Sequence, residues 1–262
     1  MTPTLAQIVK GLLRSINRFP RKKLGQHFLV DPQVLSRIIE AAELKPDDTV
    51  IEIGSGLGLL AFEAAKRVKK VIAVEIDREL LKLSQEVLKD CSNVEYVGED
   101  FLNFKLPTSN FKVLGNLPYY ITAPIVEKIL TAETKPELAV IMVQKEVGER
   151  MAAGPGTKKF GSFSIFVQYY AEVKLNSLVS KSSFHPWPEV SSAVMTLRPH
   201  INPKYPVQDE KRFFDIVHAA FQQRRKKLRN SLAKFNLPDS PLMARRPEQL
   251  SIEEFAALSR QS

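Results

Sequence analysis

The sequence has little cysteine and no long apolar run. Its 262 residues include one cysteine, Cys91, which excludes an internal disulfide framework or a cysteine-rich zinc site and is typical of a reducing compartment. No stretch reaches the about eighteen apolar residues of a membrane-spanning helix, and the N-terminus lacks the apolar core of a secretion signal. We therefore expect a cytoplasmic protein without a membrane partner.

Patterns that bind metal are also missing. His185, His200 and His218 show no ligand spacing, and the single cysteine cannot complete a mixed site. We assign no metal.

Acidic residues are outnumbered. There are 38 Lys and Arg against 29 Asp and Glu, which gives a net charge of +9. Such an excess attracts polyanions, of which nucleic acid is the commonest. The basic residues are concentrated in residues 1–30, which contain no acidic residue, and in residues 222–234. The candidate RNA-binding residues are Arg21, Lys22, Lys23, Arg224, Arg225, Lys226, Lys227 and Arg229.

The N-terminal segment has apolar residues at helical spacing with basic residues between them. The apolar residues are Leu5, Ile8, Val9, Leu12, Leu13 and Ile16. This pattern resembles a mitochondrial presequence, and a short docking helix of the mature protein explains it equally well. Both readings stay open.

Strand-like apolar runs alternate with helical patterns from residue 49 to residue 143. We expect strands at 49–53, 70–76, 94–97, 112–114 and 138–143, and helices at 32–42, 59–67, 78–89 and 123–130. Apolar strands joined by helices predict a parallel sheet covered on both faces. Helices at 145–153 and 163–170 and strands at 171–179 and 191–197 follow, so the α/β sheet has seven mostly parallel strands.

Residues 198–206 contain three prolines in nine residues, which predicts a domain boundary. We expect a larger domain at 1–200, with 1–30 as a basic N-terminal extension. Residues 201–262 show only helical patterns and predict a small, basic, all-α RNA-binding domain.

Three predicted strand ends carry residues suited to a nucleotide, and open parallel sheets bind ligands at this edge. Glu52-Ile53-Gly54-Ser55-Gly56-Leu57-Gly58 follows the first strand, Glu75 ends the second, and Asp100-Phe101 follows the third. The third glycine comes one residue too early for a dinucleotide fingerprint, which favours S-adenosylmethionine over NAD. A carboxylate at the second strand end can bind ribose hydroxyls.

The fourth strand ends in Asn116-Leu117-Pro118-Tyr119. The Asn116 amide oxygen and the Leu117 carbonyl can accept hydrogen bonds from the amine of adenine, Pro118 fixes the backbone, and Tyr119 can stack on the base. These residues are our catalytic candidates, and catalysis of this kind is orientation for in-line transfer.

This Asn-Leu-Pro-Tyr motif resembles that of the ribosomal RNA adenine N6,N6-dimethyltransferase family. Further stretches agree in order over most of residues 21–235. They are Leu24–Leu29, Val143–Val147, Phe184-x-Pro186-x-Pro188-x-Val190-x-Ser192-Ala193, and Ala220–Asn230.

The resemblance implies a Rossmann-like class I methyltransferase that dimethylates two adjacent adenosines in the 3′-terminal hairpin of small-subunit (16S) rRNA. It implies that Phe184 closes over the flipped base opposite Tyr119 as a further catalytic residue. It also implies cofactor contacts, which with the strand-end candidates are His27, Leu29, Gly54, Gly56, Glu75, Asp100, Phe101 and Asn116. The family usually has asparagine where this chain has His27.

Other functions stay open. A 23S rRNA methyltransferase of the macrolide-resistance type shares the cofactor residues, and an assembly factor or mitochondrial transcription factor of this fold would lack catalysis. The intact glycine loop and target motif favour an enzyme. A zinc deaminase also acts on adenine but needs more than one cysteine, and the basic charge argues against a small-molecule methyltransferase. We expect a monomer.

Overall fold

The computed structural model describes residues 4–15, 21 and 25–260. The chain forms two compact units, one of Met1–Gly148 with Lys174–Pro199 and one of Glu149–Val173 with His200–Ser262. The chain crosses between units at the predicted boundary near residue 200. Residues 149–173, which we predicted in the larger domain, belong instead to the unit of the C-terminal helices.

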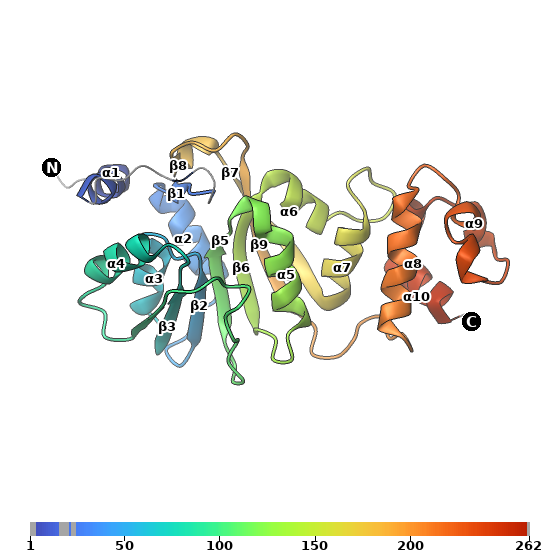
Figure 1. Ribbon diagram of the computed structural model, residues 1–262, viewed down its shortest axis with the longest axis horizontal. Coiled ribbons are helices and arrows are strands. Elements are labelled where there is room, and N and C mark those ends of the chain that lie inside the picture. The colour runs from blue at the N-terminus through green and yellow to red at the C-terminus, as the bar shows by residue number, and fades with distance from the viewer. Residues whose placement is uncertain (1–3, 16–20, 22–24, 261–262) are drawn as a thin grey trace. The chain divides into compact units, whose positions relative to one another are not determined.

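The seven strands form one sheet in the order β4-β3-β2-β5-β6-β9-β7 (Figure 1). Strands β2 to β6 pair with one another in parallel, and β9 pairs antiparallel with β6. The predicted mostly parallel, seven-stranded α/β sheet is therefore confirmed. The strands are β2 Thr49–Ile53, β3 Lys70–Val74, β4 Val94–Val97, β5 Lys112–Asn116, β6 Leu138–Gln144, β7 Ala171–Val179 and β9 Ser192–Pro199.

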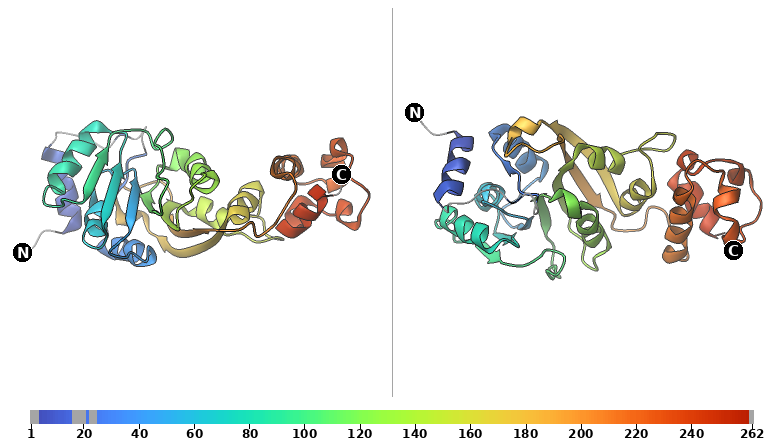
Figure 2. Two further views of the ribbon diagram at one scale, coloured as in Figure 1. Left: turned by 90° about the horizontal axis from the view of Figure 1, so that it is seen from below. Right: turned by 45° about the horizontal axis from the view of Figure 1, so that its top comes forward.

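Helices follow the strands as the apolar spacing predicts (Figures 1 and 2). Those of the first unit are α1 Leu5–Ser15, α2 Pro32–Ala41, α3 Leu59–Ala65, α4 Arg78–Val87 and α5 Thr122–Thr131. Asp31 caps α2 by accepting hydrogen bonds from the backbone of Gln33 and Val34, and proline takes the first helical position. Apolar side chains of α2 and α3 pack on the sheet in one buried cluster.

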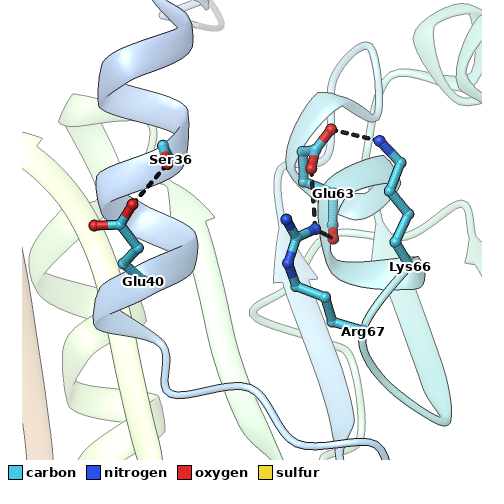
Figure 3. A network of polar contacts seen from close by, with 5 residues as sticks. All are labelled: Ser36, Glu40, Glu63, Lys66 and Arg67. Carbon is cyan, nitrogen blue, oxygen red and sulfur yellow. Dashed lines mark hydrogen bonds and ion pairs between the residues drawn. The ribbon is translucent and has the colours of Figure 1, made fainter.

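The solvent-facing sides of α2 and α3 carry polar pairs one helical turn apart (Figure 3). Ser36 donates to Glu40, and Glu63 accepts from Lys66 and Arg67. Each exposed pair of this kind adds only a few tenths of a kcal/mol. The buried cluster, not these pairs, stabilises the layer of helices.

One strand pair was not predicted. β1 (Phe28–Leu29) pairs antiparallel with β8 (Phe184–His185), and α1 packs against β8. Two residues are too few to show a strand period, so the sequence pattern has no signal for this pair. It joins the N-terminal segment to a loop about 155 residues later.

The second unit is helical apart from the start of β7. Its helices include the end of α6 (Lys145–Met151) and α7 (Ser162–Tyr170), α8 (Glu210–Gln222), α9 (Leu228–Ser231) and α10 (Ile252–Arg260). Aromatic rings of Tyr169, Tyr170, Phe213 and Phe214 pack between α7 and α8 at centroid distances near 5 Å. These two tyrosines therefore pack within the unit. The helical prediction after residue 207 is confirmed.

Candidate active site

A pocket opens at the carboxyl ends of β2, β3 and β5 and encloses about 1030 Å³ of space, part of it open to solvent. Most predicted cofactor and target residues line it together. These residues are His27, Leu29, Gly54, Gly56, Glu75, Asp100, Phe101, Asn116 and Pro118. Because all of them belong to the first unit, one compact body builds the whole pocket.

The backbone of the glycine loop is hydrogen-bonded to the Glu75 carboxylate. The Gly56 backbone N–H donates to Glu75 Oε2 at 2.8 Å, and the Asp77 N–H donates to Oε1 at 2.8 Å. Gly56 has φ +54°, and a Cβ there would lie 3.4 Å from the Phe28 ring. The positive φ therefore favours glycine at this position, whereas the contact with Phe28 would be an ordinary one. Burial raises the pKa of the Glu75 carboxyl, and these two donors oppose the shift.

Glu52 is the most deeply buried acid of the pocket. It is 2% exposed, and its Oε2 has no hydrogen-bond partner among the described residues. Burial, aided by the charge of Glu75, raises the pKa of Glu52 to about 8, although the Ala61 backbone N–H donates to the carboxylate. A buried, unpaired carboxylate oxygen at a pocket wall suits a cationic ligand group.

The third strand end forms an apolar wall beside an acid. Asp100 accepts from the Leu102 backbone N–H at 2.9 Å, which fixes the turn. The Phe101 ring is buried and stacks on Phe104 with ring centroids 6.1 Å apart. An aromatic wall next to a carboxylate can take the flat face and the amine of a base.

The target motif presents two free acceptors. The Asn116 Nδ2 donates to the His27 carbonyl at 2.9 Å, which turns Oδ1 away from that bond. The Leu117 backbone N–H donates to the Met142 carbonyl at 3.0 Å. Within the described part of the chain, neither Asn116 Oδ1 nor the Leu117 carbonyl accepts a hydrogen bond. The Leu117 side chain itself is buried.

Tyr119 stands beside the pocket rather than in its wall. Its hydroxyl is 2.7 Å from Ser192 Oγ, and burial raises the pKa of the phenol. Its ring stacks on the His27 ring, with centroids 5.9 Å apart and planes at 25°. The His27 Nδ1 lies 2.9 Å from the Pro186 carbonyl. His27 thus joins Tyr119 to the segment after β8, while its backbone orients Asn116.

Phe184 is placed differently from what the family resemblance implies. Its side chain is 1% exposed and packs in the core cluster with Leu29 and Val34. It does not line the pocket. In this conformation Phe184 supports the β1–β8 pair, and a stacking role would require it to move.

The basic candidates divide into engaged and free side chains. Arg21 forms an ion pair with the buried Asp77 at 3.7 Å, and Asp77 also accepts from Gln26. Arg224 donates to the carbonyls of Thr157 and Lys158. Arg225, Lys226, Lys227 and Arg229 are exposed and show no ion pair within the described residues. Lys22 and Lys23 lie outside the described residues.

Several pocket residues were missed by the sequence reading. Ile76 directly follows Glu75 and is 51% exposed, and Tyr120 is 58% exposed at the pocket rim. An apolar residue after a strand-end acid and a second aromatic after Tyr119 were the available signals. The structure contains no cluster of metal-ligating side chains in the residues it describes, and no helix among them is long and apolar enough to span a membrane.

Comparison with known proteins gives one consistent family. The model of the family described as ribosomal RNA adenine dimethylase matches residues 17–250. The chain is 43% identical over 275 residues to the ribosomal RNA small subunit methyltransferase A of Moorella thermoacetica, which covers 95% of each chain. The same enzyme of Bacillus cytotoxicus is 43% identical, with 91% of this chain covered and 90% of the relative.

Two solved structures are similar over most of the chain. A dimethyladenosine transferase from Plasmodium falciparum has a TM-score of 0.78 at 25% identity and covers 88% of this chain and 96% of its own. The 23S rRNA methyltransferase ErmE has a TM-score of 0.72 at 31% identity and covers 88% of this chain and 99% of its own.

Proposed function

This chain belongs to the ribosomal RNA adenine dimethylase family, and we propose that it methylates the N6 amines of two adjacent adenosines in the 3′-terminal hairpin of 16S rRNA. The product is N6,N6-dimethyladenosine, made late in small-subunit assembly. The observation that carries this substrate is the 43% identity over 95% of the chain to a small-subunit methyltransferase.

The methyl donor is S-adenosylmethionine, and the pocket fits it. The orphaned, buried Glu52 Oε2 suits the ammonium of its amino-acid part. Glu75 suits the ribose hydroxyls, and Asp100 with the Phe101 wall suits the adenine. When bound, this cofactor supplies a methyl group on a positively charged sulfur.

Asn116 and Leu117 act on the target amine. The lone pair of an adenine amine is delocalised into the ring, so the amine is a weak nucleophile. Asn116 Oδ1 and the Leu117 carbonyl accept hydrogen bonds from its N–H groups, which favours a pyramidal nitrogen with its lone pair free. The His27 carbonyl fixes the Asn116 amide in the required orientation. Catalysis is then mainly positioning, and the amine gives up its proton after the methyl transfer.

Tyr119 and the basic segment 225–229 hold the RNA. We assign the stacking of an extruded adenine to the Tyr119 ring, whose hydroxyl contacts Ser192 and whose ring stacks on His27. The exposed basic side chains of residues 225–229 contact phosphates and add affinity that does not depend on the RNA sequence. The second unit, which contains the whole predicted domain at 201–262, serves as an RNA-binding domain, and the enzyme acts as a monomer.

A 23S rRNA methyltransferase is the second candidate, because ErmE is 31% identical over 88% of this chain. The 43% identity to small-subunit enzymes is higher and covers more of the chain. A non-catalytic assembly or transcription factor is disfavoured, because the free acceptors of Asn116 and Leu117 and the cofactor pocket are intact.

The test uses labelled S-adenosylmethionine with small ribosomal subunits that lack the 3′-terminal dimethyladenosines, and separately with large-subunit rRNA. Nucleosides are identified by mass spectrometry after digestion. We expect dimethyladenosine at two adjacent small-subunit positions. Label only in large-subunit RNA would assign the chain to the resistance type. No label in either, with cofactor bound, would favour the non-catalytic factor.

A further inference from the structure

The single tryptophan of the chain, Trp187, is exposed and directly follows Pro186, whose carbonyl contacts the pocket residue His27. It is 71% exposed, and the proposed mechanism does not use it. A lone exposed apolar residue needs no explanation. The residues around Trp187 in the sequence and fold, however, indicate a role for its exposure.

Trp187 directly follows the residue that ties its segment to the target motif. The Pro186 carbonyl lies 2.9 Å from His27 Nδ1, and the His27 ring stacks on Tyr119. The segment is also held on its amino side, because Leu29 and Phe28 pair with Phe184 and His185. Trp187 therefore has an exposed ring, and in the sequence it directly follows a residue whose carbonyl lies 2.9 Å from His27 Nδ1.

The neighbouring helix brings positive charge to β8, which ends two residues before Trp187 in the sequence. α1 packs against β8, and its Val9 and Leu13 are buried against Phe28, as a docking helix requires. Lys10 and Arg14 remain exposed on α1. Burial, and after it the charge of Lys10, lowers the pKa of His185, which places this ammonium near β8. Figure 1 shows α1, β1 and β8 together.

We propose that α1 and the segment after β8 form an RNA-binding surface in which Trp187 stacks on a base flanking the target adenosine while Lys10 contacts a phosphate. This α1–β8 surface (Lys10, Arg14, His185 and Trp187) rests on the proposed function, because it assumes that RNA is the substrate. An exposed aromatic ring beside basic side chains is the common arrangement for single-stranded nucleic acid. Stacking on the ring contributes affinity that does not depend on salt, and the basic side chains contribute the part that weakens with salt.

Because the sequence contains one tryptophan, its fluorescence reports on this ring alone. The wild-type protein is titrated with the unmodified 3′-terminal hairpin of 16S rRNA, and binding is followed in parallel by anisotropy of end-labelled RNA. We expect the fluorescence to fall as the anisotropy rises, since a stacked base quenches indole emission. Methylation of undermethylated small subunits is measured with the same preparations.

Variants separate stacking from charge. Trp187→Ala should weaken RNA binding and raise KM for small subunits about tenfold with kcat nearly unchanged, whereas Trp187→Phe should retain most of the affinity. Phe62→Ala removes another partly exposed ring and should change neither. Lys10→Ala should lower the slope of log affinity against log salt by about one. Lys45→Ala, at an exposed position in the turn before β2, should leave it unchanged.

The outcomes are distinct. Normal binding and methylation, with unchanged fluorescence and a Trp187→Ala variant equal to wild type, would overturn this surface and leave the proposed function standing. Failure of the wild type to bind or methylate any small-subunit RNA would overturn the proposed function, and the surface with it.

Discussion

Substituting Glu52 by glutamine tests the electrostatics at the bottom of the pocket. Burial raises the pKa of Glu52 to about 8, whereas an unfolded glutamate titrates near 4.3. Each pKa unit corresponds to about 1.36 kcal/mol, so an ionised Glu52 costs the folded protein about 5 kcal/mol. The folded protein thus keeps a proton that the unfolded chain has released between these two pH values.

The sign of the effect follows from this proton. The stabilising contribution of Glu52 is complete below about pH 4.3 and is lost as the pH rises towards 8. The free energy of unfolding, measured by urea denaturation without cofactor, should fall more steeply with pH in the wild type than in Glu52→Gln. The difference should reach several kcal/mol at pH 8. Glu86→Gln, at an exposed position of α4, is the control for net charge and should follow the wild type.

Cofactor binding gives a second readout. At pH 7 a group with a pKa near 8 is about nine-tenths protonated, so pairing of Glu52 with the cofactor ammonium should release nearly one proton. Calorimetry in two buffers of different ionisation enthalpy counts this proton, and Glu52→Gln should release none. Parallel pH curves for wild type and Glu52→Gln would refute the raised pKa, and equal proton release would refute the pairing.

Three further variants test the other roles. Asn116→Ala should lower kcat about a hundredfold or more while the Kd for S-adenosylmethionine changes less than about threefold, measured by single-turnover methylation and calorimetry. Glu75→Ala should raise the cofactor Kd at least about tenfold, because it removes charged acceptors for the ribose; a loss of RNA affinity alone in both variants would show that the roles are wrong. Replacing Arg225, Lys226 and Lys227 by glutamine should lower the salt dependence of RNA affinity by about one unit of slope per residue, and an unchanged slope would exclude them as phosphate contacts.

Local sequence determined the sheet and most of the pocket. Glu52, Glu75 and Asn116 lie at or next to the carboxyl ends of three apolar runs, and parallel strands place such ends at one edge. The glycine at position 56 was predictable from the loop pattern, and its positive φ agrees with that pattern. These features depend on the order of residues within one strand and turn.

Tertiary structure alone decided how distant segments complete the site. The β1–β8 pair, the bond of His27 to Pro186 and the burial of Phe184 depend on segments more than 150 residues apart, which no local period encodes. Solvent exclusion, and not residue type, sets the pKa of Glu52, so its sequence context could not reveal it. Burial and long-range contact are properties of the folded chain, and they determine which predicted residues face the pocket.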